Sequence, residues 1–205
     1  RFIFSSELKG FRGLKNLSLQ DPVELEPGHY VEYDLVKKTI SKKKFYKPSY
    51  NIINYNNDIN KIANGLHKIL DESAKNRTMG DVPICTMLSG GIDSVLTTFY
   101  VFKNLDFRKI KYQPTSYVFS VKGFDSIDVH RARLAASGFK KINLKLIEDE
   151  ATREQIVDDI PKIIETFEMR KIKALSFYPL PIYWYLAPRM KEDGFKVTIG
   201  GHGVD

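Results

Sequence analysis

Residues 89–94 read Ser-Gly-Gly-Ile-Asp-Ser and have the types and spacing needed to bind phosphate. Two successive glycines let a loop wrap closely around an anion with its N–H groups pointing inward, and Ser89 and Ser94 add hydroxyl donors. Asp93 would repel phosphate unless it holds a divalent cation between its carboxylate and the phosphate. The Gly-Lys-Ser/Thr of a Walker loop is absent from this stretch. A tight turn that caps a helix is the alternative explanation.

The neighbouring elements place this loop at the edge of a sheet. Residues 82–88 are a short, continuously apolar run, typical of a strand buried on both faces, and residues 95–105 have the length and apolar content of a helix. Such a helix directs its positive N-terminal end at the loop. Ligands of parallel sheets bind beyond the carboxyl ends of the strands, which is where this loop would lie.

Helices and strands alternate along the rest of the chain. The pattern predicts helices over 57–75, 126–137, 152–167 and 179–193, and strands over 116–121, 142–147 and 196–199. Alternation of this kind predicts an α/β fold, a parallel sheet with helices on both faces. Residues 1–45 instead indicate short strands and turns that would bury a poor core alone. We therefore expect two domains, 1–45 and 46–205.

Composition limits the function classes. The chain has 205 residues, 42% of them hydrophobic, and a net charge of +7. Cys85 is its single cysteine, so no internal disulfide can form; a reducing compartment, the cytoplasm, is the default expectation, and we interpret Cys85 as a packing residue. No apolar run approaches the ~20 residues of a membrane span. We therefore do not expect a membrane as a partner. The basic run 37–47 favours a solvated connector over a nucleic-acid patch, so we do not expect nucleic acid as a partner either.

Several segments, in order, resemble the asparagine synthetase family. Residues 81–94 are similar to its DVP…LSGGLDS stretch, whereas SGGxDS alone marks the wider class of ATP pyrophosphatases. Residues 119–123, with Asp128, Ala132 and Ala136, resemble the strand and helix that follow the loop in that family. Residues 164–168 resemble its IETYD segment, and 200–205 lie where it has SGEGSD. Residues 4–10 and 25–30 look like the last part of its glutaminase domain.

The resemblance implies a PP-loop sheet of the adenine nucleotide alpha hydrolase type, preceded by a β-rich remnant of an Ntn-type glutaminase domain. It also implies an ATP-dependent ligase. A carboxylate such as aspartate attacks the α-phosphate of ATP, pyrophosphate leaves, and ammonia from glutamine displaces AMP from the acyl-adenylate. The family's binding positions fall on residues of this chain. Main-chain N–H groups of 89–93 would hold pyrophosphate, Asp93 and Asp205 would hold Mg²⁺, Leu88 and Val121 would border adenine, and Gly200 and Gly201 would lie under the ribose and base.

His202 is the main departure, because the family has Glu at this position. A histidine either transfers a proton near neutral pH or lines the pocket and donates a hydrogen bond. The substitution leaves two further readings open: a relative that joins another carboxylate and amine, such as a β-lactam-type or peptide cyclase, and a nucleotide-binding module without catalysis. We also expect a truncated fragment that is inactive alone and prone to self-association as a homo-oligomer. Finally, we expect Gly90→Val to block phosphate without unfolding the sheet.

Overall fold

The computed structural model describes residues 3–11, 23–48, 58–105, 110–167 and 179–201. The chain divides into two compact units, Arg1–Asn57 and Asp58–Asp205. None of the described helices is long and apolar enough to cross a membrane.

Unit 1 holds a short 3-10 helix, η1 (Leu8–Phe11), and an antiparallel hairpin of β1 (His29–Tyr33) and β2 (Ile40–Lys44). The turn is held by Asp34, whose Oδ1 accepts hydrogen bonds from two following N–H groups at 2.8 Å each. Strand β2 lies inside the basic run that we expected to be a connector, and all five of its residues are exposed. Lysine is a poor strand former, so pairing with β1 is what defines this strand. The assignment of residues 1–45 to a glutaminase-like domain stays a prediction.

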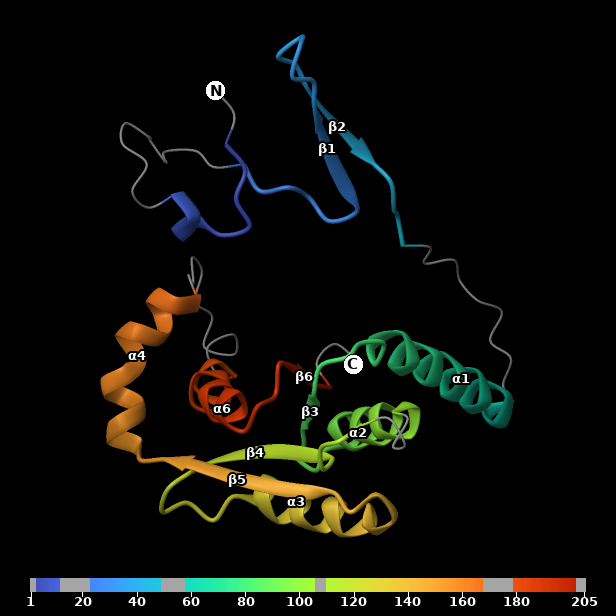
Figure 1. Ribbon diagram of the computed structural model, residues 1–205, viewed down its shortest axis with the longest axis vertical. Coiled ribbons are helices and arrows are strands. Elements are labelled where there is room, and N and C mark those ends of the chain that lie inside the picture. The colour runs from blue at the N-terminus through green and yellow to red at the C-terminus, as the bar shows by residue number, and fades with distance from the viewer. Residues whose placement is uncertain (1–2, 12–22, 49–57, 106–109, 168–178, 202–205) are drawn as a thin grey trace. The chain divides into compact units, whose positions relative to one another are not determined.

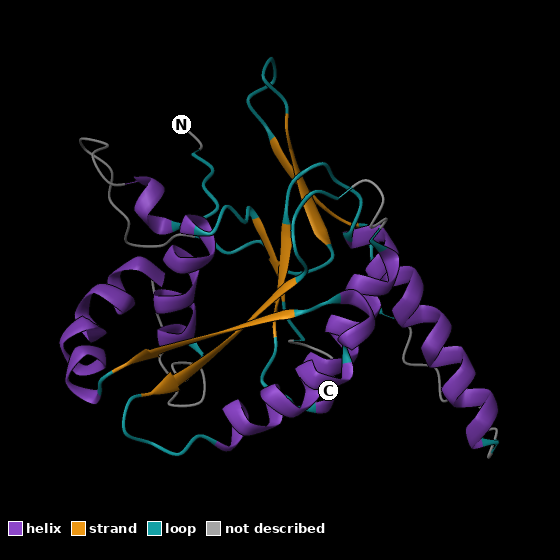
Figure 2. Cartoon of the chain, turned by 60° about the horizontal axis from the view of Figure 1, so that its bottom comes forward, coloured by secondary structure: helices purple, strands orange, loops and turns teal. Residues whose placement is uncertain are grey.

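Unit 2 is built on a parallel sheet of four strands in the order β5-β4-β3-β6. The strands are β3 (Ile84–Met87), β4 (Thr115–Val121), β5 (Lys145–Ala151) and β6 (Val197–Ile199). Helices α2 (Ile92–Asn104) and α3 (Ile127–Gly138) pack against one side of the sheet, and α6 (Leu180–Glu192) packs against the other. In Figure 1, α6 and α3 lie on opposite sides of β4 and β5, and Figure 2 shows the same strands with helices around them. The predicted α/β fold is confirmed.

Alternate residues of β3, β4 and β5 enter different cores, as expected for strands buried on both faces. Ile84 of β3 packs with α2, and Val118 of β4 packs with α3. Cys85 and Tyr117 point the other way and pack with Leu186 of α6. Burial raises the pKa of the fully buried Cys85 thiol to about 11, which supports a packing role for this residue.

Two outer helices complete the unit. Helix α4 (Arg153–Phe167) packs on α6, and α1 (Ile59–Arg77) packs on α2. The apolar stripe that predicts α1 does not face the sheet. Of its five Ile and Leu side chains, Ile59, Ile62, Leu66 and Ile69 are 53–78% exposed, and only Leu70 is half-buried. Contact with α2 is made on another face, through His67, Asp71 and buried Ala74.

The largest differences between expected and observed element boundaries are at the start of α2 and in β5, which ends at Ala151, four residues later than expected. Helix α2 begins at Ile92, three residues earlier than expected, so it starts directly on the glycine pair. The strand expected over 142–147 starts only at Lys145, because Asn143 is in the left-handed region with φ of 51° and closes a 3-10 turn, η2 (Lys140–Ile142). Helix α4 begins with a reciprocal cap: Thr152 Oγ1 accepts from the Gln155 N–H, and the Gln155 side chain accepts from the Thr152 N–H.

Candidate functional site

The strand order creates a crevice at the carboxyl edge of the sheet. From β3 the chain crosses to β4 and β5 on one side, and later returns to form β6 on the other side of β3. The order of the strands therefore reverses at β3, and ligands of open α/β sheets bind at such a switch point. The loop after β3 is the serine- and glycine-rich stretch 89–94, and Gly201 lies just after β6.

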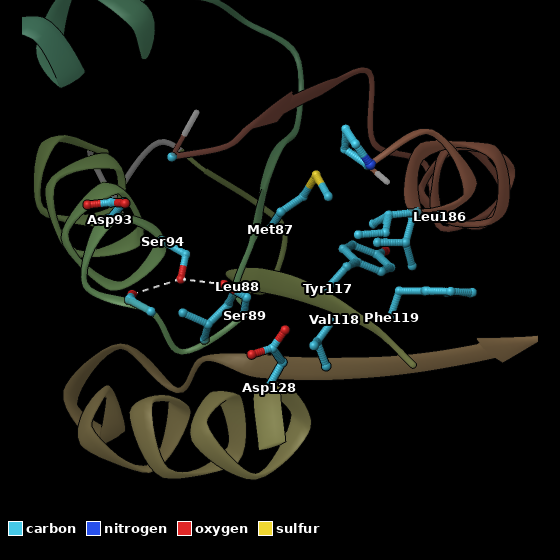
Figure 3. A pocket seen from close by; sticks show the side chains of 14 residues that line it. Met87, Leu88, Ser89, Asp93, Ser94, Tyr117, Val118, Phe119, Asp128 and Leu186 are labelled. Carbon is cyan, nitrogen blue, oxygen red and sulfur yellow. Dashed lines mark hydrogen bonds between the residues drawn. The ribbon is translucent and has the colours of Figure 1, made fainter. Parts of the chain in front are cut away.

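The loop after β3 is held from two sides. The Leu88 N–H donates to the carbonyl oxygen of Tyr117 at 2.8 Å, which extends the sheet to the start of the loop. The Ser94 hydroxyl donates to the Gly91 carbonyl at 3.0 Å, and the Ser89 hydroxyl donates to Ser94 at 3.2 Å (Figure 3). Gly91 is the N-cap residue of α2, so the unpaired N–H groups of the first helical turn open onto the loop.

A fully buried hydroxyl cluster fixes α2 beneath the loop. Thr98 of α2 donates to Thr86 of β3 at 3.1 Å, and Thr86 shares a 2.6 Å hydrogen bond with Ser116 of β4. Ser94 and Thr98 lie one turn apart on α2, so the same face of the helix braces the loop and meets the sheet. The position of the loop is thus set by three elements at once.

Three glycines serve different purposes here. Gly90 has φ of +77°, and a Cβ there would lie 2.4 Å from the Arg131 backbone of α3. Gly201 lets the chain after β6 touch the first turn of α2, because a Cβ would lie 2.8 Å from the carbonyl carbon of Asp93. Gly91 has an ordinary φ of −70° and room for a Cβ, whose nearest neighbour would be Ser89 Oγ at 3.7 Å. The expectation that Gly90→Val spares the fold is therefore wrong, since position 90 is needed for packing.

A pocket of about 350 Å³ opens at this crevice, and its described lining has two halves. The polar half contains the loop, Gly201, and the side chains of Asp93 and Asp128 in the first turns of α2 and α3. The apolar half lies toward α6 (Figure 3). It is lined by Met87, Tyr117, Phe119, Pro179, Ile182 and Leu186. A ligand that fits both halves has an anionic group at one end and a flat or apolar body at the other.

Asp93 and Asp128 are the charged side chains of the described lining. No group of three or more His, Cys, Asp or Glu residues within the described ranges could hold a metal ion. A divalent cation at Asp93 would therefore need oxygen ligands from a bound phosphate as well as from the protein. This donor set fits a hard cation such as Mg²⁺ carried with a nucleotide, and does not fit a closed protein cage.

Most of the residues expected at the site line the pocket, and some do not. Leu88, Ser89, Gly91, Asp93, Ser94 and Gly201 are among the lining residues. Gly90, Val121 and Gly200 are not: Gly90 turns toward α3, and Val121 pairs with Ala151 at the end of β4. His202 and Asp205 lie outside the described residues.

The apolar half of the pocket was not predicted from the sequence. Phe119 lies two residues before Val121 on the same face of β4, which is a signal that the alternation of a strand provides. Ile182 and Leu186 lie at i and i+4 of α6, so one face of this helix could have been assigned to the pocket. Which of several apolar helix faces meets the pocket follows only from the packing of α6 on β4.

Comparison with known proteins identifies the family. The sequence profile described as asparagine synthase matches residues 65–205, which include all four strands of the sheet and the whole pocket lining. The chain belongs to the asparagine synthase family. Membership of this family accounts for the order of the matching segments along the chain.

Three curated members of the asparagine synthase family align with 69–98% of the chain. Probable glutamine-hydrolysing asparagine synthetases from Dictyostelium discoideum and Schizosaccharomyces pombe are 25% and 27% identical over 98% of the chain. Asparagine synthetase B of Escherichia coli is 26% identical over 69% of it. The chain spans 36% of the length of the first two relatives and 26% of the third.

Two solved structures are similar to this member of the asparagine synthase family. One is the NH3-dependent NAD synthetase of Campylobacter jejuni, with a TM-score of 0.42, 18% identity, and coverage of 70% of this chain and 56% of that one. The other is the glutamine-dependent NAD+ synthetase of Acinetobacter baumannii in complex with ADP, with a TM-score of 0.38, 16% identity, and coverage of 82% and 29%.

Proposed function

We propose that this chain forms the ATP-binding part of an ATP-dependent carbon–nitrogen ligase. The parent reaction would activate a carboxylate as an acyl-adenylate, release pyrophosphate and form an amide. Membership of the asparagine synthase family supports the reaction class. The observation that carries the proposal is the loop at 89–94, which lies at the switch point of the sheet, on the N-terminus of α2, with Gly201 pressed against the same helical turn.

The two halves of the pocket suggest how ATP lies. Its phosphates would occupy the polar half, where backbone N–H groups of the loop and of the first turn of α2 are donors for anions. Its base would occupy the apolar half, between the end of β4 at Phe119 and the α6 side chain of Ile182. This placement keeps Leu88 at the pocket and replaces Val121 with Phe119 as the β4 residue beside adenine.

The negative charge that develops on pyrophosphate during the proposed reaction would lie beside the backbone N–H donors of the loop at 89–94. When a carboxylate attacks the α-phosphate, the leaving pyrophosphate gains negative charge beside the loop. Fixed backbone N–H groups that already point at that position stabilise the charge without reorganising. Mg²⁺ bound with the nucleotide would neutralise further phosphate charge, held by Asp93 and, in the same proposal, Asp205.

The remaining assignments follow the family. Ammonia released from glutamine would be the amine, because the relatives are described as glutamine-hydrolysing, and residues 1–45 would be the end of the domain that releases it. Aspartate is the carboxylate in a family member that makes asparagine. His202 would lie beside the α-phosphate, either as a proton-transfer group or as a hydrogen-bond donor.

Variants at position 91 test the phosphate site without disturbing the fold. Asp and Ser are both preferred N-cap residues, so Gly91→Asp and Gly91→Ser should leave the free energy of unfolding equal or slightly higher. Gly91→Asp adds a carboxylate where phosphate binds, and we expect the dissociation constant for ATP to rise about 100-fold, or ~2.7 kcal/mol. Gly91→Ser should raise it far less.

The measurement is ATP titration by calorimetry, beside urea unfolding of each variant. Gly65→Ala is the matched control, since Gly65 lies in α1 with no atom near a Cβ. Equal ATP affinity in Gly91→Asp and the parent chain would remove the loop from the proposal. Exchange of labelled pyrophosphate into ATP, with aspartate and other carboxylates as cosubstrates, then separates a ligase from a nucleotide-binding module.

A further inference from the structure

Asp159 of α4 is the centre of a hydrogen-bonded cluster that reaches α6. Its Oδ2 accepts a hydrogen bond from the indole Nε1 of Trp184 at 3.1 Å and one from the hydroxyl of Tyr185 at 3.0 Å. Its Oδ1 accepts from Nζ of Lys162 at 2.8 Å, one turn along α4. The Asp159 side chain is 21% exposed, so these donors take the place of most of its water. Two adjacent aromatic residues of α6 are thus bound to one carboxylate of α4.

The Tyr185 ring connects this cluster to the pocket. It stacks on Phe119 of β4 with an angle of 6° between the ring planes and 5.4 Å between the centroids. Phe119 in turn lines the apolar half of the pocket, as do Ile182 and Leu186, which flank Tyr185 on α6. A movement of the Tyr185 ring would therefore shift Phe119, and a rotation of α6 would shift all of these side chains together.

We propose that Asp159 is a positioning residue for the half of the pocket that receives the nucleotide base. By binding Tyr185 and Trp184, it fixes the rotation of α6 and keeps the Phe119 ring at the pocket wall. This inference rests on the proposed binding of ATP, and it concerns a residue that does not touch the ligand.

The protonation states suit this role. The hydrogen bond from Lys162, followed by those from Trp184 and Tyr185, lowers the pKa of Asp159, so the carboxylate is ionised at neutral pH. Burial, followed by the hydrogen bond to Asp159, raises the pKa of Tyr185 to about 12, so its hydroxyl keeps the proton that it donates. Hydrogen bonds from neutral donors to an ionised acceptor are stronger than neutral pairs, and they hold both aromatic rings in one orientation.

The C-terminal end of α6 is held independently of Asp159. The Tyr117 hydroxyl donates to Asp193 Oδ2 at 2.7 Å just past this helix, and Leu186 and Met190 are buried in the core beneath it. Loss of Asp159 should therefore loosen the part of α6 beside the pocket while the helix stays attached to the sheet. This separation makes a change in base binding distinguishable from general unfolding.

The test compares two ligands that differ in the base. ATP would use both halves of the pocket, whereas inorganic tripolyphosphate would use the polar half alone. In Asp159→Ala we expect the dissociation constant for ATP to rise about tenfold, or ~1.4 kcal/mol, and that for tripolyphosphate to stay the same. Tyr185→Phe, which keeps the ring and removes the hydroxyl, should give a smaller change in the same direction, and it decides the question if Asp159→Ala does not fold.

The control is Asp158→Ala, which removes the same charge from the neighbouring, exposed position of α4 and should change neither constant. Parallel weakening of both ligands, or unchanged ATP binding in Asp159→Ala and Tyr185→Phe, would overturn the positioning role and leave the proposed function standing. If the parent chain binds neither ligand, the proposed function fails and this inference fails with it.

Discussion

At the scale of single residues, the glycines of the site differ in what they do. Gly90 is required by backbone conformation and by contact with α3, and Gly201 by contact with α2. Gly91 has no such constraint, which leaves exclusion of a side chain from the phosphate position as its purpose in the proposal. A sequence motif shows the three only as glycines, so the structure is needed to separate packing from binding.

We expect Gly90→Ala to lower the free energy of unfolding by about 3 kcal/mol or more, from the left-handed backbone and the overlap with the Arg131 backbone together. Urea unfolding of the variant measures this loss. Gly138→Ala, at the end of α3 with no atom near a Cβ, is the control and should be close to neutral. A Gly90→Ala protein as stable as the control would mean that the loop is not packed on α3.

The polar half of the pocket could be predicted from sequence, and the apolar half could not. Residues 89–94 are contiguous, and a strand before them and a helix after them fix their place by local rules. Phe119, Ile182 and Leu186 come from two distant segments, and only the docking of α6 on β4 brings them together. The family resemblance places Val121 beside adenine, whereas the β4 residue that lines the apolar half is Phe119, two residues earlier.

At the scale of elements, the hydrophobic periodicity of the sequence predicts where the helices lie better than it predicts which face of each helix is buried. Helix α1 was predicted from its apolar stripe, yet Ile62 and Leu66 of that stripe are more than half exposed. The face on α2 carries His67, whose ring nitrogen is hydrogen-bonded to the hydroxyl of Tyr100, and Asp71, which accepts from Asn104 at 2.9 Å. Polar contacts like these leave no repeating pattern of apolar residues in the sequence, so hydrophobic periodicity cannot predict them.

The orientation of α1 has a direct consequence for stability. We expect Leu66→Gln to change the free energy of unfolding by no more than about 0.5 kcal/mol, because the side chain is largely exposed. Ile163→Ala should cost about 2–5 kcal/mol, because Ile163 of α4 is fully buried and its loss leaves a cavity. Chemical denaturation of both variants makes the comparison. A large loss in Leu66→Gln would show that this stripe is covered in the folded chain.

At the scale of the whole α/β unit, carboxylates add polar links between elements, and two of the three linked pairs also share an apolar core. Asp71 links α1 to α2, Glu148 links β5 to α3 through Arg133, and Asp193 links α6 to β4 through Tyr117. The side-chain hydrogen bond across each link is the first cause of a lowered pKa for the carboxyl group. The links therefore depend on ionised carboxylates.

These three carboxylates make the stability of the fold depend on pH. Each folded-state pKa lies below the ordinary value of 3.8 for Asp or 4.5 for Glu, so the stabilisation is complete above those values and is lost as pH falls through the folded-state pKa. We expect the free energy of unfolding of the chain to decline below roughly pH 4. Urea unfolding across this range measures it. Asp193→Asn should flatten part of the decline, and rising stability on acidification would contradict the prediction.

The pairing of β3 with β6 also governs when the site can exist. Strands β3, β4 and β5 follow one another along the chain, so they can pair as soon as residues 58–151 have left the ribosome. Ile84 of β3 can pair with Val197 of β6 only after the chain between them has been made. Contacts between such distant residues form slowly because a long loop has to close. Gly201 reaches α2 only after that event. The crevice is thus a late product of folding, and a chain in which β6 has not docked would retain most of its secondary structure without the site.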